Sequence, residues 1–272
     1  MRIDAGDGHW EGETVKRIGL GGLLVELLIL VAILLIPAGC ATNRWKQEQA
    51  GVHVNIGIAQ LESRQYHEAM KEFLAAQEID PSNARIYYYL GIAYNGKGLR
   101  EKAIEAFDRA LSLKPDYAEA SNYLGTVYLD MGLWDKAIEL FGRAVSNMMY
   151  DTPAVALYNM GWAYYNKGDY AIALVKYQEA ITRQPSSVLL PLIEKNMGLA
   201  SFAQNDTEEA IEHFKKSLNI APNLTESLYW LGECHVKLHD RPSALKAFQE
   251  VLNLAPESRF GLNARKRIEE LK

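Results

Sequence analysis

Two histidines and a cysteine near the C-terminus have the residue types and spacing to bind a metal ion. His235 and His239 are four residues apart, directly after Cys234, and this spacing can place both imidazoles on one face of a helix. No carboxylate or third ligand follows at a useful spacing, His239 falls in an expected turn, and His235 takes a position that tyrosine fills elsewhere in the chain. We therefore expect packing roles for these residues, no metal site and no cofactor.

Other catalytic patterns do not occur in the sequence. The chain of 272 residues has no phosphate-binding glycine loop, no nucleophile elbow and no HExxH pattern, and its carboxylates are spread along its length. The formal net charge of −5 is too balanced to indicate binding to nucleic acid or to an anionic surface. We expect a protein that is not an enzyme and has neither a small-molecule substrate nor a nucleic-acid partner.

Cys40 follows a segment that is typical of export signals. A basic pair precedes an apolar run over residues 18–36, and two small residues stand directly before the cysteine. Residues 1–39 resemble a bacterial lipoprotein signal, in which the cysteine is acylated, for example with palmitate, and becomes the first mature residue. An uncleaved transmembrane helix is the alternative, because such a run can just cross a bilayer of roughly 30 Å. In both cases the basic flank predicts that the rest of the chain lies outside the cytoplasm.

The residue after Cys40 bears on which membrane would hold such a lipoprotein. Lipoproteins retained in the inner membrane of many bacteria resemble one another in having aspartate at this position, and this chain has Ala41. The resemblance implies an outer-membrane lipoprotein that faces the periplasm. An inner-membrane anchor with a periplasmic domain is the alternative.

The chain after residue 50 repeats itself at steps of 34 to 37 residues. Each copy has an alanine, an aromatic residue four positions later, and a small residue or valine three positions after that. The six copies are Ala69-Phe73-Ala76, Ala103-Phe107-Ala110, Ala137-Phe141-Ala144, Ala173-Tyr177-Ala180, Ala210-Phe214-Ser217 and Ala244-Phe248-Val251. A glycine stands twelve residues before each first alanine, at Gly57, Gly91, Gly125, Gly161, Gly198 and Gly232. A proline follows twelve residues after it in five copies, at Pro81, Pro115, Pro185, Pro222 and Pro256.

These residue types suit antiparallel helix pairs that stack on one another. Glycine and alanine allow two helices to approach closely, the aromatic ring fills the space between neighbouring repeats, and proline ends the second helix. The pattern resembles the tetratricopeptide repeat, which implies an all-α, right-handed superhelical solenoid of six repeats. We expect a linker over residues 40–49 and a C-terminal capping helix over residues 261–272. The expected repeats within residues 50–260 are 50–83, 84–117, 118–151, 154–187, 191–224 and 225–258.

In a stack of this kind the first helix of each repeat lines a concave groove. The residues three before, one after and four after each glycine are expected to face it, given the period of an α-helix. The resulting groove candidates are Val54, Ile58, Leu61, Tyr88, Ile92, Tyr158, Trp162, Tyr165, Leu199 and Phe202. Apolar and aromatic surface of this kind predicts an extended or helical segment of another protein as the ligand. The alternatives are that these side chains contact another part of the same chain or belong to a shared core.

The stretch from Asn122 to Ile181 resembles the PilF/PilW family, the pilotin lipoproteins of type IV pilus biogenesis. The resemblance is carried by Asn122-Tyr123-Leu124-Gly125, by Gly132-Leu133-Trp134-Asp135-Lys136-Ala137, by the long link Tyr150-Asp151-Thr152-Pro153-Ala154 and by Ala156-Leu157-Tyr158-Asn159-Met160-Gly161. It implies that the protein binds a secretin subunit and aids its outer-membrane assembly, with Val54, Ile58 and Leu61 as the contact. The alternative is a general periplasmic scaffold for peptidoglycan enzymes, polysaccharide export or outer-membrane assembly.

Overall fold

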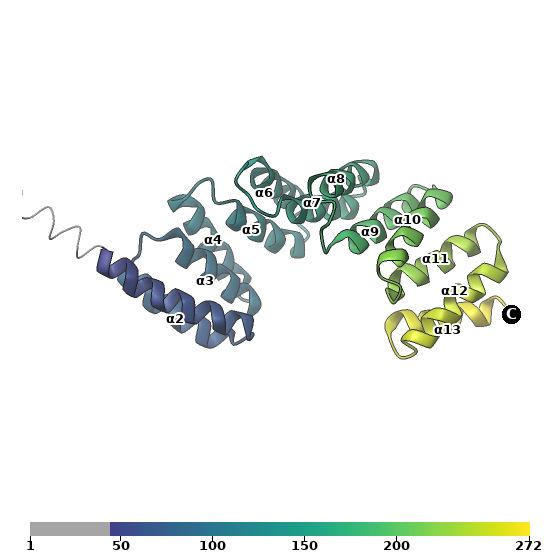
Figure 1. The fold of residues 1–272 in the computed structure, drawn as a ribbon, viewed down its shortest axis with the longest axis horizontal. Coiled ribbons are helices and arrows are strands. Elements are labelled where there is room, and N and C mark those ends of the chain that lie inside the picture. The colour runs from purple at the N-terminus through teal and green to yellow at the C-terminus, as the bar shows by residue number, and fades with distance from the viewer. Residues whose placement is uncertain (1–43) are drawn as a thin grey trace, which may run out of the picture.

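The computed structural model describes residues 44–272, which form helices and turns without any β-strand (Figure 1). The first helix covers residues 44–62. The helices that follow are α2 (Tyr66–Ile79), α3 (Ala84–Gly96), α4 (Arg100–Leu113), α5 (Ala118–Asp130), α6 (Trp134–Ser146), α7 (Pro153–Lys167), α8 (Tyr170–Arg183), α9 (Leu190–Ala203), α10 (Thr207–Ile220), α11 (Thr225–Lys237), α12 (Arg241–Leu254) and α13 (Arg259–Glu270).

The helices are arranged as six hairpins. Helix 44–62 pairs with α2, and the later pairs run from α3 with α4 to α11 with α12. From α3 onward, each first helix also packs on the second helix of the preceding hairpin. The last helix, α13, packs on α12 and α11 as the first helix of a further repeat would. The predicted all-α solenoid of six repeats with a C-terminal capping helix is confirmed.

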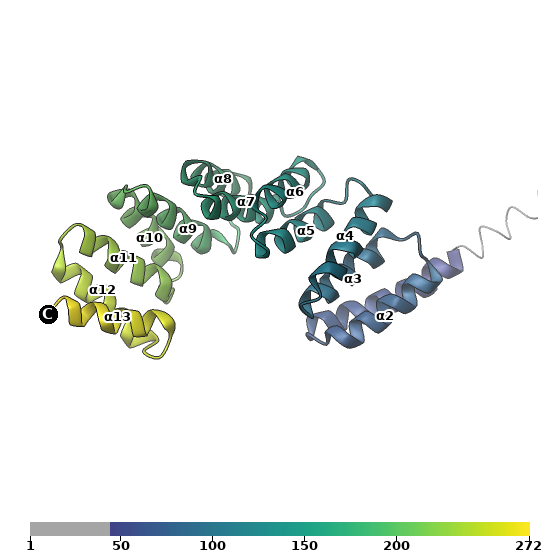
Figure 2. The same cartoon turned by 180° about the vertical axis from the view of Figure 1, so that it is seen from behind.

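The stack curves into an arch. Successive first helices contact each other, α3 with α5, α5 with α7, α7 with α9, and α9 with α11, whereas no such contacts join successive second helices from α2 to α12. Contacts on one side only bend the stack toward that side. Figures 1 and 2 show the result, with α6, α8 and α10 along the outer side of the crown and α5, α7 and α9 on the inner side.

Each repeat is closed by a glycine of the first helix packed against an aromatic ring of the second. A Cβ atom at Gly91 would lie 2.6 Å from the nearest ring atom of Phe107, and one at Gly161 would lie 2.5 Å from the ring of Tyr177. These distances leave no room for a side chain at the glycine. The rings themselves are fully buried, so the glycine and the ring together determine how closely the two helices approach.

The turn within each repeat contains one residue with a positive φ angle. Glycine supplies it at Gly98, Gly132 and Gly168, where the left-handed conformation is free of steric cost. The other turns use Arg64, Asn205 and His239, with φ of 57°, 68° and 58°. His239 therefore lies in a turn beyond the end of α11.

The two longer links between repeats are fastened to the preceding link. Asn147 donates a side-chain hydrogen bond of 2.7 Å to the carbonyl oxygen of Asp116, and Gln184 donates one of 3.1 Å to that of Asp151. Three consecutive links are thus joined along one edge of the stack. Met148 and Val188 project from this edge almost fully exposed.

The N-terminal helix starts earlier than the sequence indicates. Residues 44–49, expected as part of a linker, are helical and continuous with the first repeat. Their sequence has no glycine or proline to end a helix, and an ion pair of 3.0 Å joins Arg44 to Glu48 one turn later. No helix among residues 44–272 is long and apolar enough to cross a membrane, and the predicted signal with Cys40 lies outside the described residues.

Candidate functional site

The structure separates the predicted groove residues into buried and partly exposed ones. Val54, Tyr88 and Leu199 have at most 9% of their surface exposed, so they belong to the core and offer little surface to a ligand. The partly exposed residues are Ile58, Leu61, Ile92, Tyr158, Trp162, Tyr165 and Phe202. Val54 and Tyr88 stand three positions before their glycines and are buried, whereas Tyr158 at the same position of the fourth repeat stays partly exposed.

Tyr88 shows why a groove position becomes part of the core. Its ring lies 4.9 Å from Tyr89, 5.1 Å from Tyr117 and 5.5 Å from Tyr123, measured between ring centroids. Burial raises the pKa of Tyr88 well above its ordinary value. The aromatic residues of the second and third repeats therefore pack against one another, which removes Tyr88 from the groove surface.

The middle of the groove contains a partly exposed aromatic group that we call the central cluster: Tyr158, Trp162, Tyr165, Phe202 and Trp230. The rings of Trp162 and Tyr165 are stacked, with centroids 5.0 Å apart and planes 7° from parallel. Phe202 and Trp230 meet edge to face at 5.4 Å across α9 and α11. Aromatic pairs in these geometries are stabilising and hold the side chains in place before any ligand arrives.

Polar contacts between successive first helices fix the floor of the groove. Asn196 of α9 donates a hydrogen bond of 3.2 Å to the hydroxyl of Tyr158 on α7, and Asn159 of α7 donates one of 3.3 Å to Asn122 on α5. An ion pair of 2.8 Å joins Lys195 to Glu226. The charges at this level cancel, so the groove remains apolar and aromatic in character.

Ionisation does not change this character near neutral pH. Burial raises the pKa of Tyr158, partly offset by the hydrogen bond from Asn196, and burial also raises the pKa of Tyr165. Both phenols therefore stay neutral far above physiological pH. The carbonyl oxygen of the Asn196 side chain has no hydrogen-bond partner within the described residues, which marks the floor of the groove as incompletely satisfied.

Sequence reasoning missed Asn159, Asn196 and Trp230, which sit two positions before the glycine in the last three repeats. The first-helix pattern used for the prediction skipped this position. The signal that could have revealed this position is that asparagine occupies it in both the fourth and the fifth repeat, at positions 37 residues apart.

The histidines near the C-terminus do not form a shared site. Cys234 is fully buried, and burial raises the pKa of its thiol to about 12. His235 is partly buried on α11, with Nδ1 3.3 Å from Asp240, while His239 lies in the following turn. Within residues 44–272 no group of three or more histidine, cysteine, aspartate or glutamate side chains is arranged to hold a metal ion.

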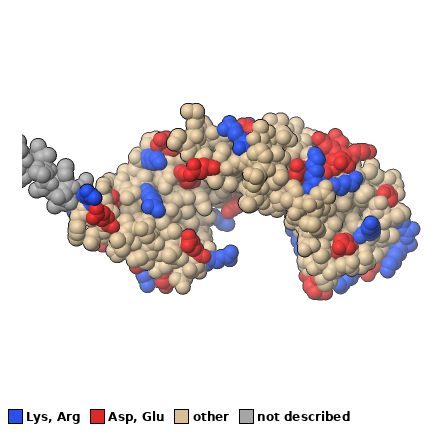
Figure 3. Space-filling model, viewed as in Figure 1, with Lys and Arg blue, Asp and Glu red and all other residues tan. Residues whose placement is uncertain are grey.

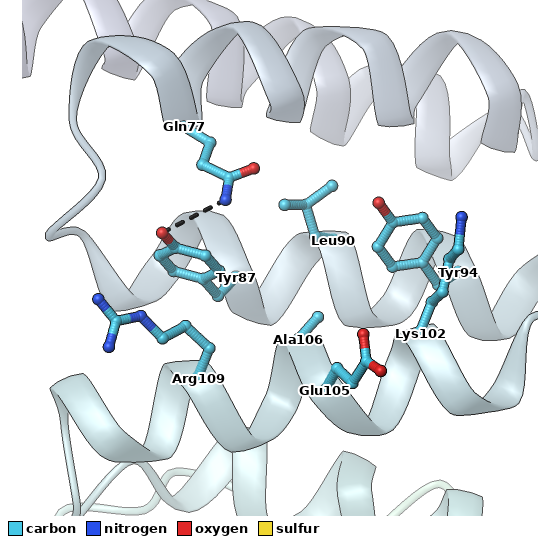
Figure 4. Close-up of a pocket in the computed structure, with 8 residues that line it drawn as sticks. All are labelled: Gln77, Tyr87, Leu90, Tyr94, Lys102, Glu105, Ala106 and Arg109. Atoms are coloured by element: carbon cyan, nitrogen blue, oxygen red, sulfur yellow. Dashed lines mark hydrogen bonds between the residues drawn. The ribbon is translucent and has the colours of Figure 1, made fainter.

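A separate cleft lies between the second helices α2 and α4, with α3 as its floor (Figure 4). Gln77 reaches across it to donate a hydrogen bond of 3.4 Å to Tyr87, and Arg109 and Lys102 lie over the rings of Tyr87 and Tyr94. The same cleft recurs in the last repeat, where Leu228, Leu231 and His235 replace Tyr87, Leu90 and Tyr94. It is a product of the stacking geometry, so the central cluster remains the better candidate.

Charged side chains are unevenly distributed over the arch. On the face shown in Figure 3, they gather toward the C-terminal end, while the middle of the molecule is largely uncharged. The middle of this face therefore carries no large patch of one charge.

Family comparisons agree with the repeat architecture. The tetratricopeptide repeat family matches residues 116–186, 158–225 and 201–265, which together run from residue 116 to residue 265. Residues 54–122 match the family "Regulator of microtubule dynamics protein 1-3". Tetratricopeptide repeat proteins typically act as protein-binding scaffolds without catalytic activity, and no catalytic family is indicated.

Curated relatives match only part of the chain. The photosystem I assembly protein Ycf3 of Acaryochloris marina is 35% identical over 79 residues, which are 29% of this chain and 48% of the relative. FK506-binding protein 59 of Drosophila melanogaster is 25% identical over 111 residues, 38% of this chain and 25% of that protein. The chain thus spans about half the length of the Ycf3 proteins that it matches, and a quarter of the length of FK506-binding protein 59.

Solved structures extend the likeness to the whole stack. PilF of Pseudomonas aeruginosa covers 82% of this chain and 99% of its own, with a TM-score of 0.71 and 17% identity. PilW, described as a widely conserved type IV pilus biogenesis factor, covers 79% and 98%, with a TM-score of 0.73 and 21% identity. At these identities the likeness concerns the fold. Together with the repeat matches and the six stacked hairpins, it shows that this chain belongs to the tetratricopeptide repeat family, with a fold like that of PilF and PilW.

Proposed function

We propose that this protein is an envelope-anchored scaffold that holds a segment of another protein in the concave groove during type IV pilus biogenesis. The partner in this proposal is a secretin subunit, whose assembly in the outer membrane the scaffold assists. The central cluster is the observation that carries the proposal, because five aromatic side chains stay partly exposed on the inner side of the arch.

The stacked pair of Trp162 and Tyr165 is suited to anchor a ligand. Tryptophan and tyrosine are enriched among the residues that dominate binding energy, and truncating such an anchor typically costs about 2 kcal/mol or more. Stacking holds both rings in one orientation, so little side-chain entropy remains to be lost on binding. The expected ligand is an apolar or aromatic segment in helical or extended form.

The first repeat would provide a second contact. Ile58 and Leu61 remain partly exposed there, whereas Val54 is buried and supports the surface from behind. A ligand that reaches from the central cluster to Ile58 would follow the inner side of the arch across several repeats. Such an extended footprint would favour a long segment over a single side chain.

The pilus assignment rests on resemblance. PilF and PilW share the fold over almost their whole lengths, and PilW is described as a type IV pilus biogenesis factor. A predicted lipid at Cys40 would hold the scaffold at the outer membrane, facing the periplasm, although an inner-membrane anchor would serve a periplasmic scaffold as well. Two or more acyl chains hold a protein stably on a membrane, whereas one does so only marginally.

A general envelope scaffold is the second candidate. The curated relatives that match the chain include photosystem I assembly proteins, so repeats of this kind serve assembly outside pili. In this reading the partners are peptidoglycan enzymes, components of polysaccharide export or proteins of outer-membrane assembly. The groove and the anchor would be used in the same way.

The test is capture of partners from cell envelopes by the full chain, with crosslinking and mass spectrometry, comparing Trp162→Ala with Val175→Ala. Val175 is an exposed apolar residue on the outer helix α8 of the same repeat, so it is a matched control. We expect Trp162→Ala to reduce capture of a secretin roughly thirtyfold, corresponding to about 2 kcal/mol, and Val175→Ala to leave it unchanged. Both variants should keep the helical circular dichroism of the parent.

The outcomes separate the parts of the proposal. Capture of a secretin that Trp162→Ala leaves intact would rule out the central cluster as the binding site. Capture of other envelope proteins without a secretin, lost in Trp162→Ala, would retain the groove and replace the pilus role by the general scaffold.

A further inference from the structure

The N-terminal end of the stack exposes side chains whose equivalents in the later repeats are buried, apart from the partly buried Leu231. Val52, Ile56 and Ala59 lie on one face of helix 44–62, five before, one before and two after Gly57. Val52 is 57% exposed and Ile56 is 43% exposed. Trp45, seven residues before Val52 and thus on the same stripe of the helix, is 59% exposed. We call Trp45, Val52, Ile56 and Ala59 the end face.

The equivalent positions in the later repeats are buried, except Leu231, which matches Ile56 and is partly buried. Those matching Val52 are Ile86, Ala120, Ala156, Ile193 and Ser227, all with 0% exposure. Those matching Ile56 include Leu90, Leu124, Met160 and Met197, with at most 7% exposure, and those matching Ala59 are Ala93, Val127, Ala163, Ala200 and Cys234, all with 0% exposure. The first repeat thus has the apolar residues that later repeats pack against the preceding repeat, but no helix covers them within the described residues.

The missing cover is the second helix of a preceding repeat. Met160 and Ala163 of α7, for example, share one buried cluster with Ala137 and Phe141 of the preceding helix α6. No helix takes this place on helix 44–62 within the described residues. In the later repeats, a short turn joins the second helix of one repeat to the first helix of the next. Residues 44–49 are helical instead and extend helix 44–62 by about 9 Å beyond the repeat boundary, so no such turn occurs at this position.

The chain before residue 44 indicates what lies against the end face. Cys40, the predicted acylation site, is only four residues away, and the apolar run over residues 18–36 ends only eight residues away. Four extended residues reach at most about 14 Å. With Cys40 acylated, the start of helix 44–62 would therefore lie within about 14 Å of the anchor, and with a span that ends at residue 36 it would lie within about 29 Å of it.

We propose that the end face rests on the lipid surface, so that the N-terminal end of the arch is seated on the bilayer. This inference depends on the anchoring part of the proposed function and adds a second membrane contact to it. Trp45 would sit at the level of the headgroups, where tryptophan is favoured, and Arg44 and Lys46 beside it would meet anionic headgroups. Val52 and Ile56 would lose their exposed apolar surface to the acyl boundary.

The opposite end of the stack has the composition expected of a surface in water. The outward residues of α13 include Arg265, Lys266 and Glu269, all exposed, with Leu262 as an isolated apolar residue. Capping helices with a polar outer face are what terminal repeats require for solubility. The contrast between the two ends gives the arch a direction relative to the membrane.

The experiment places an environment-sensitive fluorophore on single cysteines in the full chain. Val52→Cys and Ile56→Cys are the test positions, and Leu262→Cys is the matched control at the far end. Cys234→Ala removes the buried thiol, since alanine fills the same position in four other repeats, and the same chain without an introduced cysteine measures any label on Cys40. The labelled chain is reconstituted into vesicles of phosphatidylethanolamine and phosphatidylglycerol, with and without lipids that carry a quencher in the acyl chain.

We expect the chain to co-sediment with the vesicles and the labels at positions 52 and 56 to shift to shorter wavelengths. Their emission should be lost to the acyl-chain quencher, while the label at position 262 is unaffected. Co-sedimentation with labels at 52 and 56 that behave like the one at 262 would overturn the inference and leave the anchor standing. A wavelength shift without lipid quenching would also overturn it, because the end face would then be covered by protein, such as a second copy of this chain. A chain that does not co-sediment would disprove the anchor itself, and the inference with it.

Discussion

Two histidine–glutamate contacts occupy the same positions in different repeats with their partners exchanged. In the first repeat His53 on the first helix contacts Glu72 on the second at 2.7 Å, and in the fifth Glu194 contacts His213 at 2.7 Å. Both pairs are 19 residues apart. The side chains of the first pair are about a third exposed, whereas those of Glu194 and His213 are only 11% and 8% exposed. The same contact therefore has different energetic consequences.

Breaking the buried pair should destabilise the protein far more than breaking the exposed one. His213→Leu would leave the carboxylate of Glu194 buried without its partner, at a cost of about 3 to 5 kcal/mol. His53→Leu should cost less than about 1 kcal/mol, because water can solvate Glu72. Urea unfolding followed by circular dichroism measures both. The double variant Glu194→Leu with His213→Leu should regain much of the loss, and equal effects of the two single variants would contradict this account.

At the scale of the elements, two glycines differ in whether a side chain of the partner helix packs directly against them. Gly125 of α5 faces the ring of Phe141, and an added Cβ would lie 2.6 Å from it. Gly142 of α6 is one residue beyond that ring, and an added Cβ would meet only the end of Met160 at 3.6 Å. One glycine is required by a close approach of two helices, and the other merely weakens its helix.

Substituting the two glycines should therefore have opposite effects. Gly125→Ala forces the Phe141 ring or the helices to move and should destabilise the protein by about 1 to 3 kcal/mol. Gly142→Ala fits the available space and should stabilise α6 by about 0.5 to 1 kcal/mol, because alanine has the higher helix propensity. Thermal unfolding of the two variants side by side is the measurement. A stabilising Gly125→Ala would show that α5 and α6 are less tightly packed than described.

On the scale of the whole molecule, the arch is a one-dimensional stack. Each hairpin contacts only its neighbours, apart from the contacts between successive first helices on the inner side. Interior repeats therefore pack against a neighbouring repeat on both sides. Among the described residues, the first repeat has a neighbour on one side only, and α13 has no second helix to pair with. Arg267 of α13 makes two hydrogen bonds, of 2.6 and 2.8 Å, to Glu233 on α11, which fastens the C-terminal end.

Local stability should be highest in the middle of the stack and lower at its two ends. Backbone amides of α5 to α9 should exchange with deuterium more slowly than those of helix 44–62 and of α13, because the ends open without disturbing two interfaces. Hydrogen exchange with mass spectrometry resolves these segments. Uniform protection from end to end would instead indicate a single cooperative unit.

The repeat architecture could be predicted from residues because each position of the pattern has a local reason. Gly91 and Phe107 contact each other within a single hairpin, so this contact depends little on the rest of the chain. Pro81 and Pro115 each end a helix because of the ring structure of proline. The turn residues Gly98 and Asn205 adopt a left-handed conformation that few other residues tolerate. Periodicity repeated six times then makes the solenoid the consistent solution.

The exposure of individual side chains was decided by tertiary structure. Val54, Tyr88 and Leu199 satisfied the helical register of the groove but are buried, because neighbouring first helices approach closely on the inner side of the arch. Val52 and Ile56 have the residue types of a core and are exposed, because no preceding helix covers them within the described residues. Register follows from helix geometry alone, whereas burial depends on which element packs next and how the stack curves.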